Sequence, residues 1–259
     1  LVTGVQTCAL PILRYLADLM SASLEMKLAK GDPAAPEFTN WMGDYRKFLG
    51  DSPDAVYHTA PISASHSYQI TGNIGEVDYL GFMLYGTGLN GWNRAAGNVS
   101  LEEMRVDDDG NFSLLLGGDG VVDKNTNRLA LDSDVHMIMV RQYFQDRANA
   151  KEAYFQIKKV GAAGSAKTGG AELAGALRAT TEFFNDTLAG TVALTDMVST
   201  APNSVEPPAA YNQDFAGIFY PTFDNEYLGT WYRIGEDEAL LIEGEVPDAQ
   251  YWSASLQNR

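Results

Sequence analysis

The stretch Val135-His-Met-Ile-Met-Val-Arg-Gln-Tyr-Phe144, together with Ile70-Thr-Gly-Asn-Ile-Gly-Glu-Val-Asp-Tyr79, decides the fold class. Both stretches are rich in β-branched, aromatic and other apolar side chains, which is typical of β-strands. Upstream of about residue 66 the apolar side chains recur at helical spacing instead. The sequence therefore predicts helices first and a β-sheet structure afterwards.

Further strands are expected on either side of these stretches. The turn Asp107-Asp-Asp-Gly-Asn111 separates two apolar runs, and Asp-Gly in that setting is a strong hairpin signal. A glycine-rich loop over Gly86–Gly97 carries Trp92, and a polar loop follows over Gly117–Ser133. The predicted strands are Tyr68–Ile70, Val77–Tyr85, Leu101–Val106, Phe112–Leu116, Val135–Phe144 and Tyr154–Val160. Such strands joined by turns predict an antiparallel, jelly-roll-like β-sandwich over residues 61–160.

Three helices are predicted around this sandwich. Apolar residues at intervals of four indicate an amphipathic helix over residues 13–30, and a second apolar set after Pro36 extends a helical N-terminal segment over residues 13–60. That second set is Phe38, Trp41, Met42, Tyr45 and Leu49. A third helix beginning near Leu173 and a Pro-rich connector occupy residues 161–222.

The C-terminal part resembles the start of the sandwich. Strand-like sequence returns over residues 227–233, 239–244 and 250–257. Four residues recur 172 positions later, namely Ile70 as Ile242, Gly72 as Gly244, Tyr79 as Tyr251 and Leu84 as Leu256. A hairpin alone is marginally stable, so residues 223–259 are expected to begin a second, truncated sandwich. Chance similarity between two hairpins is the alternative. The predicted class is α+β, mainly β, with flanking helices.

The first twelve residues are expected to be foreign to the natural protein. Residues 2–12 resemble the translation of a common sequencing adapter, so residues 1–12 are set aside as an artefact. A short natural apolar leader is the alternative. Cys8 is the one cysteine of the chain and lies in this segment, so disulfide, thiol and cysteine–metal chemistry are not expected. The natural N-terminus is expected to be missing, which leaves a cytoplasmic or a periplasmic location open.

The composition excludes several classes of partner. The 259 residues carry a formal net charge of −16, which argues against binding to nucleic acid and to anionic membrane surfaces. No apolar run approaches the roughly 18 residues that cross a bilayer. With 45% hydrophobic residues, the chain is expected to be a soluble globular protein of bacterial type.

From Tyr15 to Arg259 the chain resembles the bacterial DUF-twelve-fourteen domain family, a family of unknown function. The segments that carry the resemblance are Asp51–Tyr57, Ile70–Gly72, Tyr79–Phe82, Val140–Phe144, Asp146-Arg147, Gly235–Gly244 and Tyr251–Asn258. Relatives tend to have Asn-Trp-Leu where this chain has Asn127-Arg128-Leu129. The resemblance implies jelly-roll-like sandwiches that continue with further strands, and it implies no established reaction.

The candidate binding residues are Arg141, Trp92, Tyr85 and Tyr79. Arg141 lies within an apolar strand, where a charge must be paired or face a cleft, so it is expected either to bind an anionic group or to pair with Asp146 or Asp134. The three aromatic residues lie beside glycine-rich sequence and would either stack on sugar rings or anchor a loop in the core.

Other polar groups are weaker candidates. The spacing Asp123-x-Asn125-x-Asn127 resembles a calcium loop but has Arg128 where the motif needs glycine, so a solvated loop is expected, with a calcium site of another type as the alternative. Asp107, Asp108 and Asp109 are expected to be turn residues rather than paired catalytic carboxylates. His58, His66 and His136 show no metal-binding spacing. No cofactor or metal is expected.

Three functions stay open at this point. The first is a non-enzymatic β-sandwich module that binds a carbohydrate or another small ligand. The second is an uncharacterised enzyme with its site between tandem sandwiches, although no catalytic motif is recognisable. The third is an envelope or assembly protein that uses its sandwiches as interaction surfaces. All three stay open because fold does not determine function. The sequence does not predict the oligomeric state.

Overall fold

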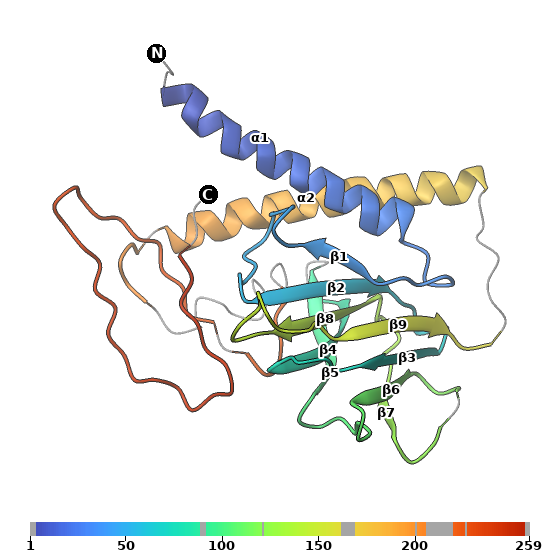
Figure 1. Ribbon diagram of the computed structural model, residues 1–259. Helices are drawn as coiled ribbons and strands as arrows, with labels where there is room; N and C mark the ends of the chain where they lie inside the picture. The colour runs from blue at the N-terminus through green and yellow to red at the C-terminus, as the bar shows by residue number, and fades with distance from the viewer. Residues whose placement is uncertain are drawn as a thin grey trace.

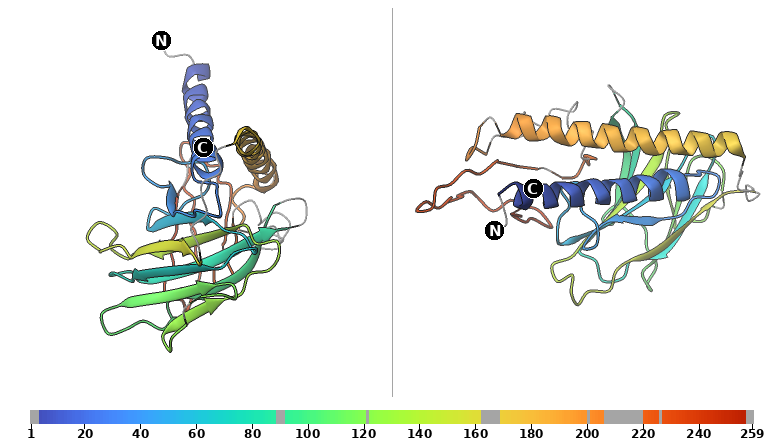
Figure 2. Two further views of the ribbon diagram at one scale, coloured as in Figure 1. Left: turned by 90° about the vertical axis from the view of Figure 1, so that its right-hand side faces the viewer. Right: turned by 90° about the horizontal axis from the view of Figure 1, so that it is seen from above.

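Two β-sheets pack face to face, and two long helices lie over the outer face of one of them (Figures 1 and 2). The computed structural model describes residues 4–256 with the exception of 89–91, 121, 162–168, 200, 206–219 and 226. The class is α+β, mainly β, as predicted.

The five-stranded sheet has the order β1-β2-β8-β4-β5, and all its neighbouring strands are antiparallel. The strands are β1 (Thr39–Met42), β2 (Ala55–Pro61), β8 (Met137–Tyr143), β4 (Tyr79–Thr87) and β5 (Asn93–Ser100). The four-stranded sheet has the order β7-β6-β3-β9 and includes one parallel pair, β6 with β7. Its strands are β7 (Thr126–Leu129), β6 (Asn111–Leu116), β3 (Tyr68–Asn73) and β9 (Tyr154–Lys159).

An apolar core fills the space between the sheets. Alternate side chains of β4 and β8 point into it, including Phe82, Ile138 and Val140, all of which are completely buried. Ile70 and Leu114 face them from the four-stranded sheet. Since β8 is buried along its whole length, its other face must be covered as well.

The helices provide part of that cover. α1 (Gly4–Ser23) continues as the π-helical turn η1 (Leu24–Ala29), and α2 (Gly170–Val198) runs antiparallel beside them (Figure 2). Leu19 and Met26 pack with Phe184 of α2 over the outer face of the five-stranded sheet. The helices therefore close the third layer of the molecule.

The predicted helix after Pro36 is wrong, and with it the helical character of residues 39–60, because β1 and β2 lie there. The carbonyl oxygen of Trp41 accepts a hydrogen bond from Arg46 Nε at 2.7 Å, and the Asn40 carbonyl oxygen accepts one from Arg46 Nη2 at 3.3 Å. β1 pairs with β2 from Thr39 onward. A short apolar stretch fits both the helical and the strand periodicity, and here pairing with β2 stabilises the strand.

Two predicted loops contain strands, and one predicted strand is a turn. The glycine-rich loop gives way to β5 at Asn93, and the polar loop contains β7. Residues 101–106 are not a strand, because the chain turns after Ser100, where Glu103 Oε2 accepts hydrogen bonds from the Ser100 N–H at 3.0 Å and from the Ser100 hydroxyl at 3.4 Å. The Met104 N–H then donates to the Ser100 carbonyl oxygen.

The turn before β6 lies where the sequence predicts it. Asp107 Oδ1 accepts hydrogen bonds from the backbone N–H groups of Asp109 and Asn111 at 3.0 and 2.7 Å. Gly110 has a φ of +81°, a conformation that side chains disfavour. This turn therefore depends on the Asp-Gly pair that predicted it.

The C-terminal segment, residues 220–225 and 227–256, contains no strand of its own, so the strands predicted there are wrong as elements. Its backbone makes isolated contacts, which are a β-bridge at Gly229 and hydrogen bonds of Asn203 with Trp231 and Arg233, and most of its described residues are exposed. The two copies of the proposed repeat differ at their turn, since Gly75 has a φ of +61° that proline at position 247 cannot adopt. A second sandwich over residues 223–259 stays a prediction.

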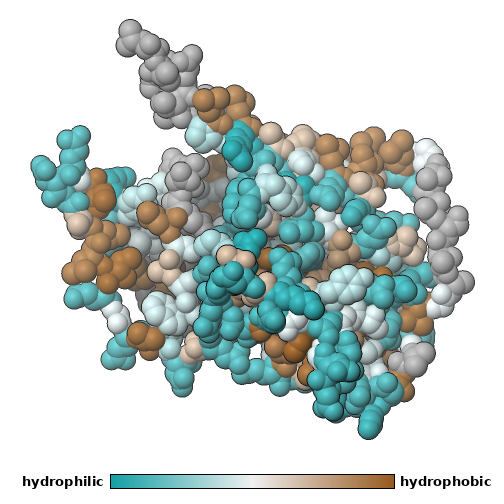
Figure 3. Space-filling view, viewed as in Figure 1, coloured by the Kyte–Doolittle hydropathy of each residue, from teal (hydrophilic) through white to brown (hydrophobic). Residues whose placement is uncertain are grey.

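Most of the large apolar side chains that are exposed among the described residues lie in three segments outside the sheets. The segments are the helices α1 and α2 and the C-terminal segment, which protrudes beyond the sheets at the left of Figure 1 and carries brown patches in Figure 3. Examples are Leu173, Leu177 and Leu241. In the part of the chain that is described, no helix is long and apolar enough to cross a membrane.

Candidate functional site

The outer face of the five-stranded sheet carries a cluster of polar aromatic side chains around one arginine. Tyr57 of β2, Arg141 of β8 and Gly81 of β4 lie side by side by strand register. The next row on the same face contains Tyr143 and Tyr79. Alternation along the strands thus places these tyrosines next to the Arg141 side chain. We call Arg141 with Tyr57, Tyr79, Tyr85 and Tyr143 the arginine–tyrosine cluster.

Gly81 makes room for this cluster. A Cβ atom at position 81 would lie 2.1 Å from the hydroxyl oxygen of Tyr79, so any side chain there would displace the Tyr79 ring. Because Gly81 is the direct neighbour of Arg141, its missing side chain leaves the Tyr79 ring beside the guanidinium. A glycine inside a strand often marks such a close approach.

The guanidinium of Arg141 is buried, and the described part of the chain brings no carboxylate within ion-pair distance of it. The residue is 4% exposed, and its Nη2 donates hydrogen bonds to the Tyr85 hydroxyl at 3.0 Å and to the Tyr220 carbonyl oxygen at 2.6 Å. Among the described residues, no ion pair includes Arg141. A buried charge normally needs an ionic partner, so this arrangement is unusual for a purely structural arginine.

The protonation states in the cluster follow from burial. Burial lowers the pKa of Arg141, but the surrounding tyrosines, Tyr85 first, outweigh it and the net shift is upward, so the group stays charged. Burial raises the pKa of Tyr57 and of Tyr85 to about 12, and Arg141 opposes the shift at both. Burial raises the pKa of Tyr143 as well. At neutral pH the cluster is therefore one cation among neutral hydroxyls.

Residues 220–225 cover the cluster. The Tyr79 hydroxyl donates a short hydrogen bond to Asp224 Oδ2, which also accepts one from Asn98 Nδ2 at 2.9 Å. The Asn225 amide donates to the Tyr143 hydroxyl at 3.2 Å. Together with the Tyr220 carbonyl, these contacts close the site with groups from a segment distant in sequence.

The loop before β2 forms one rim of the site. The Ser52 N–H donates to the Tyr57 hydroxyl at 2.9 Å, and the Tyr251 hydroxyl donates to Asp54 Oδ2 at 2.8 Å. The Tyr251 ring lies 4.8 Å from that of Tyr143. A carboxylate and several hydroxyls thus lie at the edge of the arginine–tyrosine cluster.

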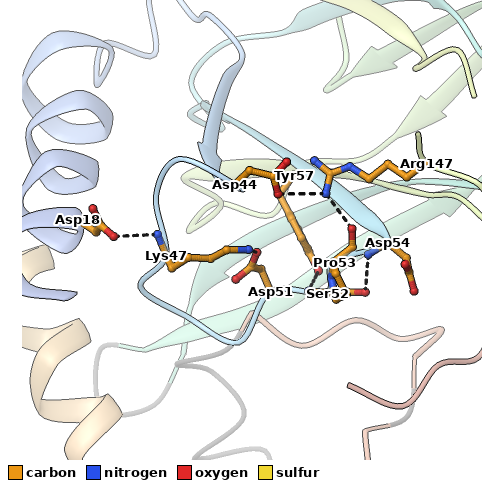
Figure 4. Close-up of polar contacts among 9 residues, drawn as sticks. All are labelled: Asp18, Asp44, Lys47, Asp51, Ser52, Pro53, Asp54, Tyr57 and Arg147. Atoms are coloured by element: carbon orange, nitrogen blue, oxygen red, sulfur yellow. Dashed lines mark hydrogen bonds and ion pairs between the residues drawn. The ribbon is translucent and has the colours of Figure 1, made fainter. Parts of the chain in front are cut away.

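Ion pairs hold this loop in place (Figure 4). Lys47 Nζ lies 2.5 Å from Asp51 Oδ2, and the Lys47 N–H donates to Asp18 of α1 at 3.2 Å. Arg147 Nη1 lies 3.7 Å from Asp44 Oδ1 and donates to the Pro53 carbonyl oxygen at 2.8 Å. The loop is therefore tied both to the helix layer and to the segment after β8.

The structure brings together three of the four predicted site residues. Arg141, Tyr85 and Tyr79 share one face of the sheet, whereas Trp92 lies half-buried just before β5, outside the cluster. Tyr85 is completely buried, so the exposed row of aromatic residues that would stack on sugar rings does not form. The alternative of an arginine inside a closed site fits the geometry better.

The expected internal partners of Arg141 bind elsewhere. Asp134 Oδ1 lies 2.6 Å from Arg94 Nη2, and Asp146 accepts a hydrogen bond from Asn149 at 2.8 Å. The pairing predicted for Arg141 is therefore wrong. Asp123 is engaged by its own turn through Asn125 N and the Thr126 hydroxyl.

The histidines do not come together. His58 contacts the ring of Phe155 at 5.2 Å, whereas His66 contacts Tyr68 at 6.2 Å. Over the described ranges, no group of three or more His, Cys, Asp or Glu side chains could hold a metal ion.

Sequence reasoning missed Tyr57, Tyr143 and the segment at Tyr220. Tyr79-x-Gly81-x-Met83-x-Tyr85 has a period of two, which places all four residues on one face of β4. That pattern was a usable signal for Tyr79 and Gly81. Nothing local indicates that residue 220 returns to this face, because the contact spans 79 positions from Arg141.

Comparison with known proteins supports the fold and leaves the activity open. No family model and no curated protein matches the chain. An uncharacterised protein from Burkholderia cenocepacia has a similar crystal structure, with a TM-score of 0.70 and 24% identity over 83% of this chain. This chain spans 58% of that protein. A protein from Vibrio parahaemolyticus is 15% identical over 61% of this chain and 46% of its own, but its TM-score of 0.31 supports no argument.

Proposed function

We propose that the chain is a ligand-binding module whose site is the arginine–tyrosine cluster, and that its ligand presents an anionic oxygen to Arg141. The observation that supports this most directly is the buried guanidinium of Arg141, whose hydrogen-bond partners among the described residues are neutral oxygens, the Tyr85 hydroxyl and the Tyr220 carbonyl. Taking a charge out of water costs several kcal/mol on the order-of-magnitude scale, and an anion offsets that cost much better than a carbonyl does.

The polar groups around Arg141 suit a small hydroxylated ligand. Asp224 and Asp54 each accept a hydrogen bond from a tyrosine hydroxyl, and they could accept one from a ligand hydroxyl in the same way. This supports a small carboxylate or a sugar acid more than a neutral sugar, because the fixed charge at the centre is positive. The alternative that the chain is an enzyme has less support, because it needs a loop carboxylate beside Arg141. The candidate carboxylate Asp134 forms an ion pair with Arg94 instead.

We also propose that the chain belongs to the bacterial DUF-twelve-fourteen family and has its jelly-roll-like, tandem organisation. The similarity in fold to an uncharacterised Burkholderia protein of greater length is compatible with this proposal. The exposed apolar side chains of the C-terminal segment are compatible with it as well.

Thermal-shift and calorimetric titration of the full chain would test the binding function. The panel is acetate, succinate, citrate, gluconate and glucuronate in low-chloride buffer. We expect at least one anion to raise the melting temperature of the wild type, since a ligand that binds the native state stabilises it. The variant Arg141→Gln should lose that shift.

Arg94→Gln is the matched control, because Arg94 is partly exposed and pairs with Asp132 and Asp134. It should keep the ligand-induced shift. The proposal is overturned if no anion shifts the wild type at millimolar concentration, or if the shift persists in Arg141→Gln.

A further inference from the structure

Tyr220 fills the site that we propose for a ligand. Its ring stands edge-on between Trp41 and Tyr85, with ring centroids 5.0 and 5.3 Å apart and interplanar angles of 88° and 89°. Its carbonyl oxygen lies 2.6 Å from Arg141 Nη2 and 2.8 Å from the Tyr85 hydroxyl. One residue thus occupies an aromatic slot and, with its own carbonyl, the acceptor position at the arginine.

The backbone of Tyr220 is in an unfavourable conformation. Its φ is +54°, a left-handed value that is uncommon for a large side chain. The next residue is Pro221, and a residue before proline prefers extended backbone. Such outliers persist where the surroundings impose them and are concentrated at binding sites and switches. The slot therefore holds Tyr220 at a cost in backbone strain.

Two polar groups in this region have no partner among the described residues. The indole N–H of Trp41, a residue with no exposed surface, lacks an acceptor. The hydroxyl of Thr222 is buried and unpartnered as well. Buried polar groups are rarely left unsatisfied, and an unpaired donor next to an aromatic slot is a position that a ligand oxygen can use.

We infer that the slot between Trp41 and Tyr85 binds a planar aromatic ring that carries a carboxylate, and that Tyr220 is a resident occupant that such a ligand displaces. This inference rests on the proposed function, since the carboxylate would be the anion at Arg141. Beyond the anion site, it specifies the class of ligand, an aromatic carboxylate. In a tyrosine, two carbon atoms separate the ring from the carbonyl carbon, so 3-(4-hydroxyphenyl)propanoate reproduces the ring, the spacer and the acceptor.

The experiment compares wild type with Tyr220→Gly, in which the ring is removed and glycine tolerates the positive φ. The probes are 3-(4-hydroxyphenyl)propanoate and its saturated analogue 3-cyclohexylpropanoate, titrated by calorimetry. We expect the aromatic probe to bind Tyr220→Gly more tightly than wild type, on the order of tenfold, because the internal competitor is gone. It should also bind more tightly than the saturated probe.

Tyr154→Gly is the matched control, because it removes the same ring from β9 of the other sheet, where Tyr154 is 70% exposed. It should bind the aromatic probe as wild type does. If Tyr220→Gly is unfolded alone, the aromatic probe should restore its native circular dichroism, and failure to do so contradicts the inference.

The two proposals fail in different ways. Binding of simple carboxylates to wild type, with no gain for the aromatic probe in Tyr220→Gly, overturns the aromatic slot and leaves the anion site standing. Absence of binding by every carboxylate to both chains overturns both.

Discussion

The two faces of the five-stranded sheet use the same strands for different purposes. On the inner face Phe82, Ile138 and Val140 pack against the four-stranded sheet. The buried Gln142 side chain finds its partner nearby in the sequence, since its Oε1 accepts a hydrogen bond from the Ala153 N–H at 2.7 Å. On the outer face Arg141 receives acceptors from a segment far away in the sequence. The inner face is therefore buried by the other sheet, whereas the outer face around Arg141 is buried by residues 220–225, which another molecule could replace.

The largest expected effect tests the inner face. Phe82→Ala removes a fully buried ring that contacts Phe112 at 5.5 Å and Phe155 at 5.9 Å. We expect a loss of about 3–5 kcal/mol in the free energy of unfolding, measured by denaturant titration, because such truncations leave a cavity. Phe223→Ala, at an exposed ring, should change little. Equal losses at both positions would contradict the assignment of the core.

The second-largest expected effect tests whether Gly81 leaves the space that the Tyr79 ring occupies beside Arg141. Gly81→Ala places a Cβ atom 2.1 Å from the Tyr79 hydroxyl, so the ring must move and its contact with Asp224 breaks. We expect a loss of about 1–3 kcal/mol in unfolding free energy, which is the usual cost of overpacking. Gly97→Ala in β5 is the control, since the nearest atom would be at 3.4 Å. The geometry is refuted if the two variants are equally stable.

The strands that carry these two substitutions are predictable from the sequence, whereas part of what covers them is not. The alternation in β4 and β8 predicts both strands and places Arg141, Tyr79 and Tyr85 among the candidates. Trp41 was assigned to a helix, because a short apolar run fits both periods until a pairing partner is known. The position of Tyr220 was not predictable, because its contacts depend on the path of a long connection rather than on any local pattern.

A smaller effect on stability separates a functional from a structural Arg141. Arg141→Met keeps the length and apolar contacts of the side chain but removes its charge. We expect the free energy of unfolding to stay within about 1 kcal/mol of wild type or to rise, because apolar replacement of a buried charge is often neutral or stabilising. Differential scanning calorimetry measures this.

The outcome separates the two roles of the outer face. Anion binding should be lost in Arg141→Met even though the fold is retained. A strongly lowered melting temperature would instead show that Arg141 mainly anchors residues 220–225.

The smallest expected effect on stability at neutral pH is that of replacing His58, which lies at the edge of the inner face. Burial lowers the pKa of His58 to about 4, and its Nδ1 has no partner among the described residues. A histidine with a lowered pKa is neutral in the fold, so its contribution to stability is full above pH 6.5 and is lost as the pH falls toward 4.

His58→Phe keeps a ring beside Phe155 and removes this titration. Urea titrations across that range should show a flatter loss of stability for His58→Phe than for wild type, with His66→Phe as the control for the chemical change. Parallel pH profiles for wild type and His58→Phe would show that His58 is protonated without cost, and that this part of the inner face is open to water.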